Sequence, residues 1–231
     1  MFIKAKALTD FKMECRDGLI GRVEQFYFDD LHWTVRYLVA DSSTWLPGKA
    51  VLISPYALGT VSKERQSVFV NLTKKQIEDS PSPDSDKPVS QQFEQAHSEH
   101  FGWPPYWDGP GAGDHHLRST RDVGRYAVEA LDGPMGHVED FVLDDGNWAI
   151  RYLVVNTRDW WPGAKVLIAP QWIERVSWGE GKVFINLSRE SIKSSPEYSE
   201  FALLSRDYEE QLHKHYARLG YWNHALPSGK R

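Results

Sequence analysis

Two arginines stand in the middle of otherwise apolar segments, and each has a glutamate in the segment before it. Arg36 lies in WTVRYLVAD and Arg151 in WAIRYLVVN, and the preceding segments carry Glu24 and Glu139. Side chains that lie opposite each other on neighbouring strands can pair when their charges are opposite, so we expect two cross-strand Arg–Glu pairs. Such pairs can be structural, or they can present a polar patch for docking or proton transfer.

An aspartate pair lies between the glutamate segment and the arginine segment in each half of the chain. Asp29-Asp30 and Asp144-Asp145 could hold a metal ion or act as an acid and a base. Aspartate is also favoured at turns, because its carboxylate accepts hydrogen bonds from nearby backbone amides. No third ligand recurs at a fixed spacing, so the sequence favours turns.

The histidines gather late in each half of the chain. His97 and His100 share one face of an expected helix, which permits a metal site. No cysteine accompanies them, and only His100 has a counterpart, His215, in the second half. The sequence therefore predicts structural or incidental histidines and no metal site. The histidines concerned are His97, His100, His115, His116, His213, His215 and His224.

No motif assigns a reaction. LPGKA lacks the loop length and the following hydroxyl residue of a phosphate-binding loop. A Gly-x-Ser-x-Gly elbow and a Cys–His signature are also missing from the sequence. We therefore predict no catalytic residues and no cofactor, and we expect the protein not to be an enzyme.

The composition narrows the class of partner. The formal net charge is −5, and neither half has an excess of basic residues, which disfavours nucleic-acid binding. A single cysteine fits a reducing compartment. The sequence shows neither an apolar signal core nor a run long enough to cross a membrane. We expect a cytoplasmic protein with protein partners and no membrane insertion.

The chain is a tandem repeat. Shifting it by 115 residues gives 29 identities in the 65 positions from Asp17 to Pro81, without a gap. The match continues through the six pairs Phe93/Tyr208, Glu94/Glu209, His100/His215, Phe101/Tyr216, Tyr106/Tyr221 and Trp107/Trp222. We predict two domains, 1–109 and 120–231, joined by a connector at 110–119.

Each repeat reads as short strands followed by helices. Asp17-Gly18 predicts a hairpin turn, and WTVRYLVAD predicts a strand with Trp33, Val35, Tyr37 and Val39 on its core face. Strands with turns every 8–12 residues are typical of a small barrel. A capping box at 73–76 begins one helix, and a second helix ends in Tyr-Trp. The expected fold is mainly β: two small barrels related by a pseudo-twofold, each followed by short helices that dock on their own or on the other barrel.

The Tyr-Trp ends allow two interpretations. Tyr106-Trp107 follows a proline-rich aromatic tract, and Tyr221-Trp222 is its counterpart. The rings could anchor the end of the helix on a barrel, or they could be exposed and mark an interface. Homodimerisation through the helices and these ends is a further option.

The segments DGLIGRVEQFYFDDLHWTVRYLVAD and DGPMGHVEDFVLDDGNWAIRYLVVN resemble the PRC-barrel family. The shared pattern is a DG turn, G-x-V, an acidic residue before an aromatic strand, a DD turn, R-Y-L-V and a late V-L-I-x-P. The family includes the cytoplasmic domain of the photosynthetic reaction centre H subunit and the C-terminal domain of ribosome-maturation factors. The H subunit's membrane helix and the further domain of the maturation factors have no counterpart in this sequence, so the likeness is closer to tandem PRC-barrel proteins.

The resemblance implies a small β-barrel that mediates contacts within a larger assembly without catalysis. We therefore expect a non-enzymatic interaction module; family analogy suggests regulation or assembly of electron-transfer or RNA-processing complexes. The interface candidates are Arg36, Arg151, Glu24, Glu139, Tyr106, Trp107, Tyr221 and Trp222. The alternative is a binder of a small ligand or metal, or an enzyme, with a site between the barrels that uses Arg36, Arg151 and nearby carboxylates.

Overall fold

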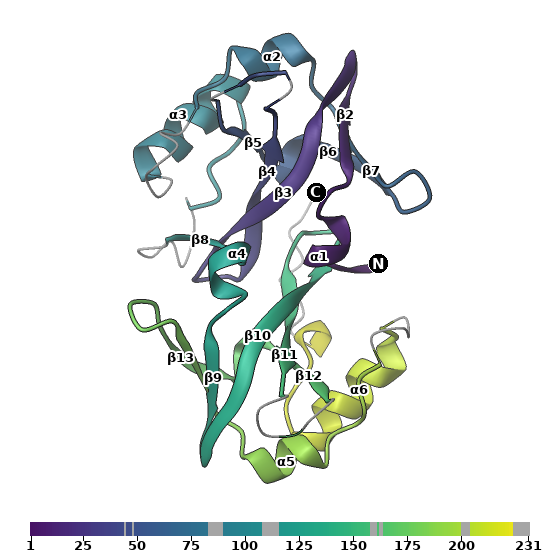
Figure 1. Ribbon diagram of the computed structural model, residues 1–231, viewed down its shortest axis with the longest axis vertical. Coiled ribbons are helices and arrows are strands. Elements are labelled where there is room, and N and C mark those ends of the chain that lie inside the picture. The colour runs from purple at the N-terminus through teal and green to yellow at the C-terminus, as the bar shows by residue number, and fades with distance from the viewer. Residues whose placement is uncertain are drawn as a thin grey trace. The chain divides into compact units, whose positions relative to one another are not determined.

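The protein forms two compact units in a computed structural model (Figure 1). Unit 1 contains Met1, Ile3–Gly124 and Asp140–Tyr152, and unit 2 contains Phe2, Arg125–Glu139 and Leu153–Arg231. Residues 140–152, which belong to the second repeat, are therefore part of unit 1. The structure describes residues 1–43, 45–47, 49–82, 90–107, 116–157, 161, 164–199 and 204–223.

The first sheet has seven strands in the order β5-β4-β3-β2-β7-β6, with β8 paired to β3. All its strand pairs are antiparallel except β2–β7, which is parallel. The pairings of the described strands do not close this sheet into a barrel. The strands are β2 (Lys12–Cys15), β3 (Gly18–Asp29), β4 (Thr34–Asp41), β5 (Val51–Ile53), β6 (Leu58–Ser62), β7 (Ser67–Val70) and β8 (Leu117–Ser119).

The second sheet also has seven strands, in the order β12-β11-β10-β9-β14-β13, with β1 paired to β10. Its parallel pair is β14–β9, the counterpart of β7–β2. The fold is mainly β, as predicted, and the two sheets repeat one strand order. The strands are β1 (Phe2–Lys4), β9 (Ala127–Ala130), β10 (Gly133–Asp144), β11 (Ile150–Asn156), β12 (Lys165–Ile168), β13 (Ile173–Ser177) and β14 (Lys182–Ile185).

Short helices follow the strands, as predicted. Thr73 caps α2 in a complete capping box with Gln76, which confirms that prediction. No helix in the described part of the chain combines the length and the apolar character that crossing a bilayer requires. The helices are α1 (Ala5–Leu8), α2 (Lys74–Glu78), α3 (Gln91–Phe101), α4 (Thr120–Val123), α5 (Arg189–Lys193) and α6 (Arg206–His215), with short 3₁₀ turns η1 (Pro55–Ala57), η2 (Pro170–Trp172) and η3 (Tyr221–Asn223).

Backbone conformation and close contacts explain why glycine occupies both glycine positions of the repeated DG-x-x-G pattern. Gly18 follows the predicted hairpin turn between β2 and β3 and has a φ of 137°. A Cβ on Gly21 would lie 2.0 Å from the carbonyl oxygen of Asp41. A Cβ on Gly136 would meet Asn156 in the same way, at 1.9 Å. Each long strand thus passes so close to the next strand that only glycine fits.

The predicted strand face is buried, but its first residue is not in the strand. Val35, Tyr37 and Val39 are each at most 5% exposed, as expected for core. Trp33 is buried too, yet it has a φ of 53° and precedes β4. Its counterpart Trp148 has a φ of 59°. The tryptophans therefore close the turn before the strand, in a backbone conformation that bulky residues rarely adopt.

The connector predicted at 110–119 is wrong at its C-terminal end, while 110–115 lies outside the described residues. Leu117–Ser119 is strand β8, and it pairs with Tyr27–Asp29 of β3 inside unit 1. Ser119 then caps α4. These elements lie 115 residues after β1 and α1, yet 2–11 and 117–126 share no identical residue. The repeat therefore begins earlier than sequence identity could show.

Each of the late helices packs within its own repeat, which settles a point that the sequence left open. Figure 1 shows α3 beside β4 and β5. Phe93 of α3 lies 6.4 Å from the ring of Tyr37 in β4, measured between ring centroids. In unit 2, Tyr216 at the end of α6 lies 4.8 Å from the ring of Trp172. The helices complete the cores of their own repeats.

Candidate functional site

Arg36 bonds to an aspartate, and the predicted Arg36–Glu24 pair is wrong. Its Nε donates to Oδ2 of Asp29 at 2.8 Å. Asp29 is fully buried and also accepts a hydrogen bond from the backbone N–H of His32. Glu24 instead accepts from Arg121 of α4 at 2.7 Å. Both of these side chains are at least a third exposed, so this ion pair contributes only about 0–1 kcal/mol.

The second repeat holds its arginine in the same way. Arg151 donates from Nε and Nη2 to Oδ2 of Asp144, at 3.1 and 2.8 Å. Glu139 accepts from Lys165 at 2.6 Å and from Asn156 at 2.7 Å. In both repeats, the last residue of the long strand therefore fixes the arginine seven positions later.

The aspartate pairs stand where the strands pass into the predicted turns: Asp29 and Asp144 end β3 and β10, and Asp30 and Asp145 begin the turns. Asp144 also accepts from the backbone N–H of Gly146, inside the turn that it begins. Asp30 accepts from the backbone N–H of His116 and from Arg118, and so ties β8 to the turn after β3. The carboxylates satisfy backbone amides and cations close to them, which is the usual work of aspartate at a turn.

The tyrosines of the Tyr-Trp ends bond back to buried glutamates of the helices that precede them, and we call this contact the anchor. The hydroxyl of Tyr106 donates to Glu94 of α3, and the hydroxyl of Tyr221 donates to Glu209 of α6 at 3.1 Å. Both glutamates are buried, at 2% and 0% exposure. Burial and the Glu94 charge raise the pKa of the Tyr106 hydroxyl well above its usual range. Each tyrosine thus bonds back to the helix that precedes it, and the anchoring of this helix end on a barrel stays a prediction.

The tryptophans of these ends pack on their neighbours. Trp107 is half-buried, with its ring 4.9 Å from that of Tyr106. Trp222 lies 4.9 Å from the ring of His213 and 4.3 Å from the guanidinium of Arg206. Both side chains therefore retain some exposed surface next to the anchored tyrosines.

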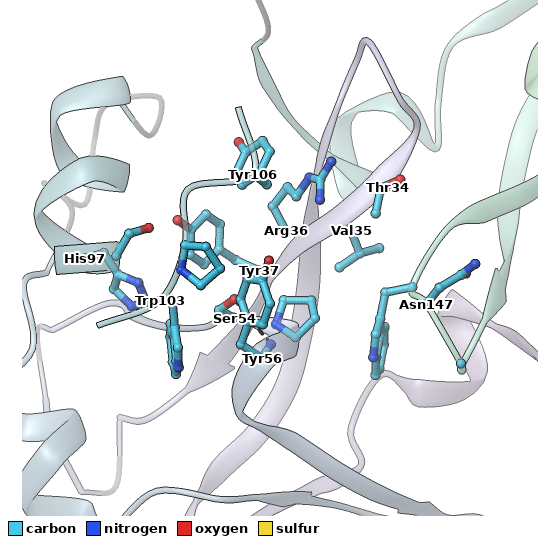
Figure 2. A pocket seen from close by; sticks show the side chains of 15 residues that line it. Thr34, Val35, Arg36, Tyr37, Ser54, Tyr56, His97, Trp103, Tyr106 and Asn147 are labelled. Carbon is cyan, nitrogen blue, oxygen red and sulfur yellow. Dashed lines mark hydrogen bonds between the residues drawn. The ribbon is translucent and has the colours of Figure 1, made fainter. Parts of the chain in front are cut away.

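A pocket of about 250 Å³ opens beside the Tyr106 anchor, and all its lining residues belong to unit 1. Figure 2 shows Tyr56 and Trp103 on one side of it and Asn147 on the other. Arg36 of β4 contributes the cationic group, and its guanidinium lies 3.9 Å from the centroid of the Tyr106 ring. The sequence did not predict this pocket, because its walls come from four separate segments.

His97 forms part of the pocket wall as a neutral ring. Its Nε2 donates to the carbonyl oxygen of Leu52 at 3.2 Å, and the side chain is almost fully buried. Burial lowers the pKa of His97 to about 4, so the ring is uncharged at neutral pH. Rings surround it, with Tyr37 at 5.3 Å and Trp103 at 5.9 Å. The structural interpretation of this histidine is confirmed.

No metal centre forms among the residues that the structure describes. They contain no group of three or more histidine, cysteine or acidic side chains that could hold an ion. His100 lies edge-on to Phe101, and His215 bonds to the backbone carbonyl of Ser191 at 2.7 Å. His115 and His224 lie outside the described residues.

The second repeat replaces the residues that give the pocket its character. At the positions 115 residues later, glutamine, leucine and arginine stand in place of Tyr56, His97 and Trp103. Ala57 is replaced by Trp172, which is 2% exposed and packs against His213 and Tyr216. The differences were visible in the aligned repeats, but only the fold shows that they gather around one cavity.

The pocket sets a few polar groups among aromatic walls. The polar groups lining it include the Arg36 guanidinium, the hydroxyls of Thr34 and Ser54, and the amide of Asn147. His97 is the one histidine among the lining residues, and its Nε2 already donates a hydrogen bond to the backbone carbonyl of Leu52. Orientation by a few polar groups among aromatic walls is typical of a binding site.

No protein-family model matches this chain, and no curated protein sequence matches it.

Proposed function

We propose that this protein is a non-catalytic interaction module built of two PRC-type β-barrel repeats, and that it docks its partner at the pocket of unit 1. The repeated strand order supports the duplication, since both sheets have the same order of strands and the same parallel pair. The steric demand for glycine at Gly21 and Gly136 supports the family pattern in both repeats.

One observation carries the choice of the docking site. The pocket combines an exposed aromatic rim with a cation whose hydrogen-bonding capacity is only partly used inside the chain. Tyr56 on the rim is 57% exposed. Arg36 uses Nε for Asp29, and within the described residues its two terminal amino groups have no hydrogen-bond partner. Aromatic residues and arginine are the types that most often carry binding energy at interfaces.

Comparative capture from the native source tests this function. The wild-type chain, the double variant Tyr56→Gln/Trp103→Arg and the control Gln171→Ala serve as baits at native expression levels. Both changes in the double variant copy the residues of the second repeat, so we expect them to be compatible with the fold. A partner that wild type and control retain, and the double variant loses, supports the proposal. An identical set of proteins on all three baits contradicts it.

A role in binding a small ligand is the second candidate function. The cavity volume of about 250 Å³ favours it, because this space accommodates a compact group better than an extended surface. The two candidates share one site, and they differ in whether the group that enters the pocket is free or belongs to a polypeptide.

A further inference from the structure

The pocket of unit 1 has a cation at one side, and two of its amino groups have no hydrogen-bond partner within the described residues. The Arg36 side chain is 19% exposed, so most of it is removed from water. Oδ2 of Asp29 accepts from Nε. Within the described residues, the two terminal amino groups are thus left for an acceptor that a ligand supplies. A guanidinium presents these two groups side by side, in a geometry that matches the two oxygens of a carboxylate.

The acids near the pocket restrict the charge of that acceptor. Asp29 is buried against Arg36 and offsets part of its charge. Arg36 is the one lysine or arginine among the residues that line the pocket, so a doubly charged group such as a phosphate would find no second cation there. A positively charged ligand would meet Arg36 itself. A single negative charge fits this electrostatic environment best.

The walls determine the shape of the ligand. The rings of Tyr56 and Trp103 lie 6.0 Å apart between centroids, and Trp148 lines the pocket as well. Flat aromatic walls favour a flat, apolar group that can stack on them. Drug-sized ligands occupy pockets of about 300–1,000 Å³, and this pocket of about 250 Å³ lies below that range. One ring with a short substituent fills it.

From these contacts, and on the basis of the function proposed above, we infer that the pocket binds a single aromatic ring that carries one carboxylate. The carboxylate bonds to the terminal amino groups of Arg36, and the ring packs among Tyr56, Trp103 and Trp148. Two sources supply this chemistry. One is a free aromatic acid, and the other is an aromatic residue at the C-terminus of a polypeptide.

Calorimetric titration of the full chain tests the inference with matched probes. The free-acid arm uses phenylacetate, with neutral phenylacetamide and cationic phenethylammonium as charge controls. The polypeptide arm uses the peptide Gly-Gly-Phe with a free or an amidated C-terminus. We expect one acid probe to bind saturably, and its neutral analogue to bind about tenfold or more weakly because it lacks the charge-assisted hydrogen bonds. Binding of phenylacetate identifies a free acid as the source, and binding of the acid peptide alone identifies a C-terminus.

Variants locate the binding within the chain. Arg36→Gln removes the cation, and Arg121→Gln, at an exposed ion pair outside the pocket lining, is its charge-matched control. Arg36→Gln also leaves Asp29 buried without its cation, so Tyr56→Gln provides a second test at an exposed position. We expect affinity to fall about tenfold or more in Arg36→Gln, to fall about fivefold in Tyr56→Gln, and to stay unchanged in Arg121→Gln.

The inference is overturned if neither acid probe binds, if acid and amide bind equally, or if Arg36→Gln and Tyr56→Gln both bind as wild type does. The titrations and the capture experiment can fail independently. A partner that depends on the pocket residues, together with no affinity for aromatic acids, would remove this ligand class and leave the docking function in place.

Discussion

The two repeats build the same helix anchor but leave different surroundings beside it. In unit 2, Arg206 at the start of α6 bonds to the buried Glu209 at 3.0 Å, and its guanidinium lies 5.2 Å from the centroid of the Tyr221 ring. In unit 1, the cation over the anchoring tyrosine is Arg36, from strand β4. One repeat thus uses a cation of the helix itself, while the other uses a strand residue that also lines a pocket.

The packing next to the anchors also differs between the two repeats. Trp172 fills unit 2 where unit 1 has Ala57. Unit 1 instead gathers Tyr56, His97 and Trp103 around a cavity of about 250 Å³. The second repeat thus fills the space beside its anchor with a tryptophan, while the first leaves a cavity there.

The largest expected effect comes from emptying the filled repeat. Trp172→Ala removes a large side chain that is 2% exposed, so the free energy of unfolding should fall by about 3–5 kcal/mol. Urea denaturation followed by circular dichroism measures it. Trp103→Ala, on the half-buried pocket wall, is the matched change and should cost less than half as much. Equal losses for the two variants would contradict the contrast between a filled and an open repeat.

Acid should weaken the first repeat through His97. Its folded-state pKa of about 4 lies below the unfolded value of about 6.5, so the neutral ring contributes fully above about pH 6.5. That contribution is lost progressively as the pH falls from about 6.5 to 4, by about 2–3 kcal/mol in total.

His97→Leu isolates this effect, because it copies Leu212 of the second repeat. Denaturant unfolding at pH 7 and pH 4.5 should show a smaller loss of stability in the variant than in wild type. The same pH dependence in both proteins would show that His97 does not titrate as a buried ring.

The cation of the second anchor should matter less, since Arg206 is 46% exposed. Arg206→Gln leaves Glu209 buried with the Tyr221 hydroxyl, and we expect a loss of about 1–2 kcal/mol after allowing for solvent screening. Thermal unfolding measures it. A double variant, Arg206→Gln/Glu209→Gln, should recover part of the loss because it removes the buried charge. No recovery would mean that Arg206 acts through its contacts with Tyr221 and Trp222 and not through the buried charge.

The smallest effect on stability is expected at the rim of the pocket. Tyr56→Gln alters an exposed side chain, so unfolding should change by less than about 0.5 kcal/mol. The same variant should nevertheless lose ligand affinity. A large drop in stability would place Tyr56 in the core and would undo its use as a binding probe.

The fold could be predicted further than the site, and the reason is physical. Strand and turn patterns are local, so the DG turn, the Val35–Tyr37–Val39 face and the capping box at Thr73 follow from spacing alone. The partner of Arg36 does not, because Asp29 reaches it only after the turn has formed. The sequence predicted only a strand–strand pair with Glu24.

The missed elements have a common cause. Strand β8 has no sequence identity to its counterpart β1, so the repeat comparison took it for part of the connector. The pocket joins β4, the turn at Pro55–Ala57, the end of α3 and the turn before β11. Each segment is unremarkable alone, and only tertiary packing brings their side chains together. The repeated Glu94/Glu209 and Tyr106/Tyr221 pairs were the one available signal of the anchor.

The most direct test of the docking function is the dissociation constant of the captured partner. It should be measured for wild type, for Tyr56→Gln/Trp103→Arg in the first repeat, and for Gln171→Ala in the second. The account predicts at least about tenfold weaker binding for the first variant, because aromatic residues at the centre of an interface carry most of its energy, and unchanged binding for the control. Equal affinity for all three proteins would contradict docking at the pocket of unit 1.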